Sequence, residues 1–194
     1  HGIPKGFEPP TNPVLKKGVL MLGGDSHQKN PENMLKAWAQ LPKELQKAHP
    51  LTILGFVGGE DSIISKTIRA LGIENDIVIK GWVTEDELIQ AMQTSKVFIF
   101  ASREEGFGFP LVQSMASGTP VVTSEADVLI EIGQDAVCSA KAEDFLALSC
   151  AVQSLLTDEQ LYNEKVKKGL TISSKFTWEH TAEHIASTYL TLLK

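Results

Sequence analysis

The sequence has little of what several classes of protein require. Its 194 residues include only two cysteines, Cys138 and Cys150, too few for a disulfide scaffold, and we expect both to be buried free thiols. No apolar run approaches the roughly 20 residues of a membrane-spanning helix, and the first residues lack the layout of a signal peptide. These absences argue against a cystine-rich secreted domain and favour a soluble intracellular chain.

Positive charge and familiar nucleotide motifs are also scarce. Because the formal net charge is -6, extended contact with nucleic acid or with an anionic membrane surface is not favoured, and a local site must hold any anionic ligand. Gly-x-Gly-x-x-Gly does not follow the first expected strand, and no Walker A sequence occurs, which argues against dinucleotide and P-loop chemistry. No cluster of His, Cys, Asp and Glu at ligand spacing lies near the candidate loops, so we expect no metal.

What the sequence does have is 42% hydrophobic residues, arranged as short apolar runs that alternate with helical patterns. Strands are expected at residues 18–22, 51–54, 77–79, 97–100, 121–123 and 136–138. Helices are expected from Pro31, after an N-cap at Asn30, and at 62–71, 84–93, 111–117 and 144–156. The helix at 84–93 is expected to start with a capping box of Thr84 and Glu87. This alternation predicts one α/β domain of Rossmann type, a doubly wound parallel sheet of about six strands with helices on both faces.

The two ends of the chain differ from this pattern. Residues 1–13 are rich in proline and are interpreted as the remnant of an interdomain linker, so that the domain itself comprises residues 14–194. From residue 158 onward the pattern is helical without further strands. An apolar stripe of Trp178, Ile185, Tyr189 and Leu192 marks the last helix, which we expect to dock on a neighbouring element.

Two loops carry the residues that point to ligand binding. In a doubly wound sheet the ligand lies beyond the carboxyl ends of the strands where the strand order reverses, here between the first and fourth strands. Lys29 follows the first strand and supplies a point charge. The helix after the fourth strand offers the backbone N–H groups of Leu111 and Val112 to phosphate oxygens. The alternative is that the glycines of these loops only permit tight turns and that Lys29 is solvated.

The segment from Glu105 to Ser124, EGFGFPLVQSMASGTPVVTS, resembles the signature of family 4 retaining glycosyltransferases, which have the GT-B fold. The resemblance covers nearly the whole chain. It extends to Gly23-Gly24 with Lys29-Asn30, to Gly81-Trp82-Val83, to residues 128–136 and to Thr177-Trp178-Glu179. It implies that this chain is the C-terminal, nucleotide-sugar-binding domain of a GT-B enzyme.

The loops after the first and fourth strands are called the first loop and the fourth loop here, and the resemblance also implies roles for residues of the fourth loop. Glu105 matches the family's first glutamate, which lies against the hydroxyls of the donor sugar and serves catalysis by binding and electrostatics, with no agreed protein nucleophile. The backbone around Phe107, Gly108 and Phe109 approaches the sugar and the phosphates. The second glutamate of the Glu-x7-Glu pair holds the ribose and is replaced here by Gln113. That amide keeps an acceptor but loses the charge-assisted bond, a difference of about 1 kcal/mol.

The other matching positions concern the diphosphate and the base. Lys29 matches the diphosphate-binding lysine, whereas the arginine that often precedes it by five residues is Gly24 here. The base is expected against Gly81, Trp82 and Val83, and Trp82 is equally compatible with an ordinary core position.

Taken together, the resemblance implies transfer of a sugar from a nucleoside diphosphate sugar to an acceptor, with retention of configuration and without a metal or other cofactor. The acceptor, a sugar, lipid or protein, is bound by the missing N-terminal domain, which could bring a cytoplasmic enzyme to the membrane face. The isolated chain is then inactive. Two alternatives remain open at this point: a non-catalytic nucleotide- or partner-binding module of GT-B descent, and a GT-B-like sugar-nucleotide epimerase.

Overall fold

Parallel strands form a single six-stranded sheet in the computed structural model, which describes residues 1–12 and 14–192. The strands are β1 (Val19–Leu22), β2 (Leu51–Leu54), β3 (Ile77–Lys80), β4 (Val97–Phe100), β5 (Val121–Ser124) and β6 (Cys138–Ala140). Their order in the sheet is β3-β2-β1-β4-β5-β6, and every neighbouring pair is parallel. The doubly wound fold is therefore confirmed. Pro13 of the expected linker and Leu193-Lys194 of the expected domain lie outside the described residues.

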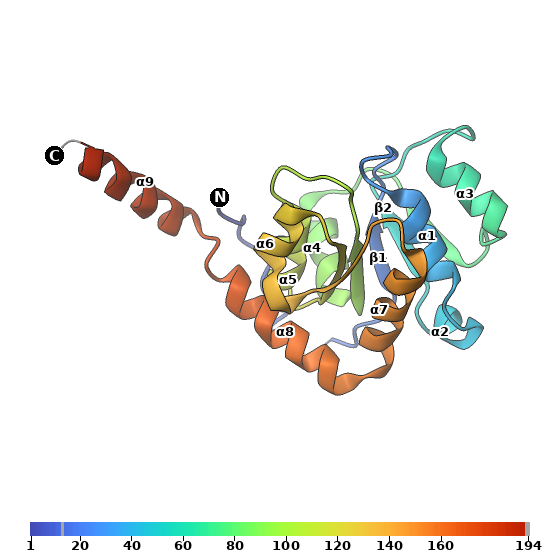
Figure 1. Cartoon of the computed structure of the whole chain (residues 1–194). Coiled ribbons are helices and arrows are strands. Elements are labelled where there is room, and N and C mark those ends of the chain that lie inside the picture. The colour runs from blue at the N-terminus through green and yellow to red at the C-terminus, as the bar shows by residue number, and fades with distance from the viewer. Residues whose placement is uncertain (13, 193–194) are drawn as a thin grey trace.

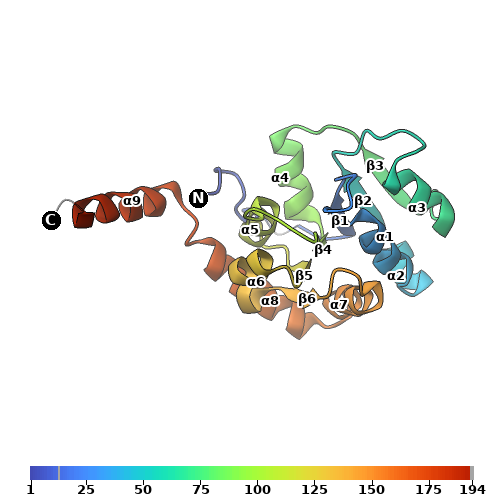
Figure 2. The ribbon, with the colours of Figure 1, turned by 45° about the horizontal axis from the view of Figure 1, so that its top comes forward.

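Helices cover both faces of this sheet (Figures 1 and 2). They are α1 (Pro31–Ala39), α2 (Lys43–Ala48), α3 (Ile63–Leu71), α4 (Glu85–Thr94), α5 (Phe109–Ala116), α6 (Asp127–Gly133), α7 (Phe145–Thr157), α8 (Glu159–Ser173) and α9 (Trp178–Leu192). α1, α3 and α7 pack on one face, and α4, α5 and α6 pack on the other. α8 lies against both α5 and α7 and closes one side of the domain.

The central strand β4 shows why both faces need cover. Its side chains alternate, so that Val97 and Ile99 join the core under α1 and α7, whereas Phe98 and Phe100 join the core under α5 and α6. All of these side chains are buried. A strand buried on both sides has a continuous apolar sequence, which is typical of a parallel sheet.

Polar side chains cap the first turns of α4 and α3. Thr84 and Glu87 form the expected capping box at the start of α4. Ser62 caps α3, its Oγ accepting from the backbone N–H of Ser65. These polar side chains satisfy N–H groups that have no partner inside the helix.

The sixth strand and three helices differ from the sequence prediction. Residues 134–136 form a short 3-10 helix, and the strand begins only at Cys138, because Val137 packs against Gly133 instead of pairing at the sheet edge. α2 and α6 were not predicted, since both are too short for a helical period to stand out. α5 begins at Phe109, two residues earlier than predicted.

The structure also tests the expectations about the cysteines and about membrane-spanning helices. Both thiols are free, as expected, but only Cys138 is partly buried, and the expectation of burial is wrong for Cys150, which faces solvent on α7. Within residues 1–12 and 14–192, no helix is both long and apolar enough to cross a bilayer.

The two ends of the chain differ in whether they pack on the domain. The N-terminal residues pack on the domain, with Phe7 only 2% exposed and the N–H of Ile3 donating to Phe176 O at 2.9 Å. α9 instead extends away from the domain (Figure 1), and no residue described in it is buried. Its apolar stripe is exposed, with Ile185 at 53% and Tyr189 at 64%. The first turn of α9 contacts the N-terminal residues, where Thr181 Oγ1 accepts from the amino group of His1 at 3.0 Å. Beyond that turn no described sheet or helix face lies opposite α9, so the expectation that its apolar stripe docks on a neighbour is wrong within the described chain.

A matched pair of substitutions tests this difference in burial. Ile99→Ala, at a fully buried position of β4, should lower the free energy of unfolding by about 2–5 kcal/mol because it leaves a cavity. Ile185→Ala, the same change on α9, should alter it by less than about 0.5 kcal/mol. Urea denaturation of both variants measures the two values. Comparable losses would show that α9 packs against the domain in solution.

Candidate functional site

Two loops meet at the carboxyl edge of the sheet, where the strand order reverses. β1 is hydrogen-bonded to both β2 and β4, and the chain leaves β1 towards one edge of the sheet and β4 towards the other. Residues 23–30 connect β1 to α1, and residues 101–108 connect β4 to α5. Crevices of this kind are the usual ligand sites of open α/β sheets.

Lys29 and Glu105 face each other across this crevice. The Nζ of Lys29 lies 2.8 Å from Oε1 of Glu105, and the side chain of Glu105 is 10% exposed while that of Lys29 is 40% exposed. Residues 76 positions apart in sequence are thus joined by an ion pair. The exposed side of the lysine leaves its ammonium available to an anion, since an ammonium has three donors.

The absence of a side chain at Gly24 leaves the space that Lys29 occupies. A Cβ at position 24 would lie 2.6 Å from Cγ and 2.8 Å from Cβ of Lys29, closer than non-bonded carbons approach. A Cβ at Gly23 would lie 2.4 Å from Cβ of Phe56. Any side chain at position 24, the arginine of the resemblance included, would displace Lys29 in this backbone.

The backbone N–H groups that are left without a helical partner at the start of α5 are not the predicted ones. Leu111 and Val112 both donate their N–H groups to Gly108 O, at 3.0 and 3.3 Å, and both side chains are buried. Their predicted role as free phosphate donors is therefore wrong, because α5 starts two residues earlier. Pro110 has no N–H. The first turn is left with the N–H of Phe109, which has no partner inside the helix.

The aromatic rings at the end of the fourth loop and the start of α5 pack against each other and against the connection between α8 and α9. The ring of Phe107 lies 4.8 Å from that of Phe109 and 5.7 Å from that of Phe176, which lies between α8 and α9. Phe107 is half-buried, and Phe109 is 37% exposed. Gln113 lies within α5 and is half-buried. Its predicted ribose contact stays a prediction.

The predicted base-binding segment lies further along the same edge. Gly81, Trp82 and Val83 follow β3, which is three strand spacings from β4, a distance of roughly 14 Å. Trp82 is 86% exposed, which rules out the core position left open by the sequence. Val57 follows β2, the strand next to β3, and is 66% exposed, so it adds apolar surface beside this segment.

Three polar residues at this edge have no binding or positioning role in the sequence prediction. Asp25 Oδ1 accepts from the N–H of Ile64 at 2.9 Å and so ties the first loop to α3. Asn30 is buried, and Arg103 donates to its Oδ1 at 2.6 Å. The Asn-Pro step was interpreted only as a helix start, and no periodicity or spacing signals a contact between residues 73 positions apart.

Metal ligands do not gather here. Among residues 1–12 and 14–192, no group of three or more His, Cys, Asp and Glu side chains could hold a metal ion. The positive groups at the crevice include the Lys29 ammonium, which is paired with Glu105, and the positive end of α5.

This geometry, a doubly wound sheet with a lysine and a carboxylate at its switch point, belongs to proteins that bind anionic small molecules. Comparison with known families identifies the class. The family of glycosyl transferases group 1 matches residues 5–186, and the chain belongs to this family.

Curated relatives support the same class. The chain is 29% identical over 184 residues to O-antigen chain mannosyltransferase B from Escherichia coli, covering 91% of this chain and 48% of the relative. It is 31% identical over 172 residues to the serotype-specific mannosyltransferase WbdA from Escherichia coli, covering 87% of this chain and 21% of the relative. The chain therefore spans about half of the first relative and about a fifth of the second.

Solved structures agree on the fold, that of GT-B glycosyltransferases. Sucrose-phosphate synthase from Thermosynechococcus elongatus aligns with a TM-score of 0.81 at 22% identity, covering 97% of this chain and 50% of that one. Alr3699/HepE from Anabaena, in complex with UDP and glucose, aligns with a TM-score of 0.76 at 21% identity, over 91% and 48% of the two chains. A C-terminal domain crystallised alone, LpcC from Francisella tularensis, aligns with a TM-score of 0.75 at 18% identity, over 88% and 95%.

The two glycines of the fourth loop provide a test of its geometry. Gly108 has φ +92°, and a Cβ there would lie 2.8 Å from Cδ2 of Leu129, so Gly108→Ala should cost about 1–2 kcal/mol of folding stability. Gly106→Ala meets nothing within 4 Å and should cost less than about 0.5 kcal/mol. Urea denaturation measures both. Equal costs would mean that the turn before α5 is not the one described.

Proposed function

We propose that this chain is the donor-binding half of a family 4 retaining glycosyltransferase, which transfers a sugar from a nucleoside diphosphate sugar to an acceptor. The observation that carries the proposal is the ion pair of Lys29 and Glu105 across the switch point, at 2.8 Å. It brings a cation for the diphosphate next to a carboxylate for the sugar hydroxyls. Membership of the glycosyl transferases group 1 family supports transfer over a purely structural role.

Lys29 and the start of α5 supply the positive charge for the diphosphate. The ammonium is a point charge that donates to phosphate oxygens, and the N–H of Phe109 lies at the positive end of the helix dipole. Five residues before Lys29, where many family members have an arginine, this chain has Gly24. The chain therefore relies on one side-chain cation at this place. A divalent ion is not required in this arrangement.

Glu105 has a different task. It is nearly buried, and its second oxygen is available to hydroxyl groups while the first accepts from Lys29. In the proposed reaction the acceptor oxygen bonds to the anomeric carbon as the bond from that carbon to the diphosphate oxygen breaks. The acceptor's proton passes to the leaving diphosphate on the same face. Glu105 orients the sugar and favours positive charge that develops on it.

The acceptor site is assigned to a part of the protein outside this chain. The chain spans 48% of the first mannosyltransferase relative, and α9 exposes apolar side chains that the described residues do not cover. Transfer requires the acceptor to be held against the anomeric carbon and water to be excluded by domain closure. The chain alone should therefore bind the donor nucleotide without catalysing transfer.

The phosphate site is tested by calorimetric titration of the 194-residue chain with uridine, guanosine and adenosine diphosphates. We expect the tightest to bind with a dissociation constant of roughly 10 μM to 1 mM, unchanged by EDTA. Lys29→Ala should weaken it about tenfold because a charge-assisted hydrogen bond is lost. Lys47→Ala, the same charge change on α2, is the control. Full affinity in Lys29→Ala, or loss of binding with EDTA, would contradict the proposal.

The two positions of the Glu-x7-Glu pair should separate binding from turnover. In the full-length enzyme, Glu105→Ala should lower kcat by about a hundredfold or more while changing nucleoside diphosphate affinity by less than about threefold, since the carboxylate faces the sugar. Gln113→Glu should preserve or improve nucleotide affinity. Steady-state kinetics with labelled sugar nucleotides and titration measure the two effects.

Equal losses in both measurements would remove Glu105 from its sugar role, and a collapse of affinity in Gln113→Glu would place Gln113 in a different contact. Nucleotide binding by a full-length protein that transfers no sugar from any donor tested would identify a non-catalytic module instead.

A further inference from the structure

Asn30 is the most constrained side chain at the switch point. It has φ 56° and ψ 39°, an uncommon left-handed conformation that costs residues with a side chain free energy, although it costs Asn less than most, and it directly precedes a proline. It is 1% exposed. It occupies the N-cap position of α1, yet its side chain does not cap the helix. An unfavourable backbone conformation persists only where surrounding contacts hold it, and such residues cluster at functional sites.

Those contacts use the full hydrogen-bonding capacity of the Asn30 amide. Its Nδ2 donates to Ala101 O at 2.8 Å and to Ala142 O at 2.7 Å. Its Oδ1 accepts from Asn33 Nδ2 at 2.8 Å and from Arg103 Nη1 at 2.6 Å. Two donors and two acceptor lone pairs are all that an amide offers. One buried side chain thus joins the loops that follow β1, β4 and β6.

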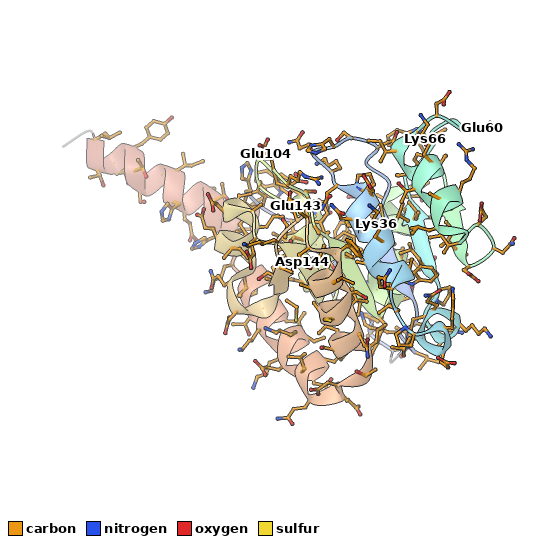
Figure 3. All side chains as sticks on the ribbon, turned by 45° about the vertical axis from the view of Figure 1, so that its right-hand side comes forward. Lys36, Glu60, Lys66, Glu104, Glu143 and Asp144 are labelled. Atoms are coloured by element: carbon orange, nitrogen blue, oxygen red, sulfur yellow. The ribbon has the colours of Figure 1, made fainter. Side chains whose placement is uncertain are left out.

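Arg103 makes further hydrogen bonds between the same loops. Its Nη1 also donates to His27 O at 2.8 Å, and its backbone N–H donates to Gln28 O at 2.8 Å. Its Nε pairs with Glu143 at 3.1 Å, and Figure 3 shows Glu143 and Glu104, the residue after Arg103, on neighbouring loops. We refer to Asn30 and Arg103 together as the loop clasp.

The clasp holds the backbone on both sides of the ion pair. Lys29 lies between Gln28 and Asn30, each bonded to the fourth loop, and Glu105 lies two residues after Arg103. Three of the five N–H donors of Arg103, one on Nε and two on Nη1, are engaged by protein groups, which fixes the guanidinium against the two loops and suits it to positioning. Groups fixed before binding do not have to be ordered when the ligand arrives, which increases affinity.

We propose that the loop clasp positions Lys29 for the donor diphosphate, and that Arg103 is a positioning residue which does not touch the donor. The inference rests on the proposed function. It also accounts for how the site works with Gly24 in place of an arginine: a single lysine held in one place loses less freedom on binding than a mobile one.

The test is a double-mutant cycle in the 194-residue chain, titrated calorimetrically with whichever of uridine, guanosine and adenosine diphosphate binds tightest. Arg103→Met should weaken binding about tenfold, and Arg103→Lys should also weaken it, because an ammonium cannot reproduce the planar fork. In a Lys29→Ala background, Arg103→Met should have less than about a twofold further effect, since there is no lysine left to position. Arg69→Met, an equal charge change on α3, is the control, and urea denaturation confirms that each variant is folded.

The outcomes separate the two proposals. If the wild-type chain binds none of the three nucleotides, the proposed function fails and the role of the clasp fails with it. If the wild type binds and Lys29→Ala weakens it, then unchanged affinity in Arg103→Met overturns the clasp alone. Full affinity in Arg103→Lys, or an equal effect of Arg103→Met in both backgrounds, also overturns it, because either result means that Arg103 acts by charge or direct contact.

Discussion

The adjacency of β1 and β4 is the constraint on which the rest of the molecule depends. Val19 pairs with Val97 and Leu20 with Phe98, so two loops that are far apart in sequence leave the sheet side by side. The chain continues from β1 and from β4 towards opposite edges, which leaves the space between the two loops open. The Lys29–Glu105 ion pair and the contacts of Arg103 with His27, Gln28 and Asn30 all span this one boundary between strands.

Much of the architecture follows from local sequence, and the prediction succeeded where the signal is local. Continuous apolar runs such as Val97–Phe100 identify buried strands, and Thr84 with Glu87 identifies a helix start by the bonds these side chains make. It failed where packing decides. Val137 belongs to an apolar run but lies against Gly133, and the strand begins at Cys138, two residues later than predicted.

The site was predictable in part for the same reason. Glu105 and Lys29 were expected at the switch point from strand order and from the resemblance to a known signature, and the structure brings them together. The free amides assigned to Leu111 and Val112 were wrong, because an N-cap glycine in a left-handed conformation moved the helix start to Phe109. The clasp was missed altogether, since the sequence shows Asn30 and Arg103 separately and only the fold shows that they touch.

The cluster formed by Phe107, Phe109 and Phe176 has a mechanical consequence. Phe176 belongs to the short connection from α8 to α9, and its ring lies 5.7 Å from that of Phe107, two residues after the glutamate of the ion pair. α9 extends beyond that connection as a lever of 15 residues, about 22 Å long. The point at which this lever leaves the domain is therefore joined by ring contact to the loop that carries Glu105.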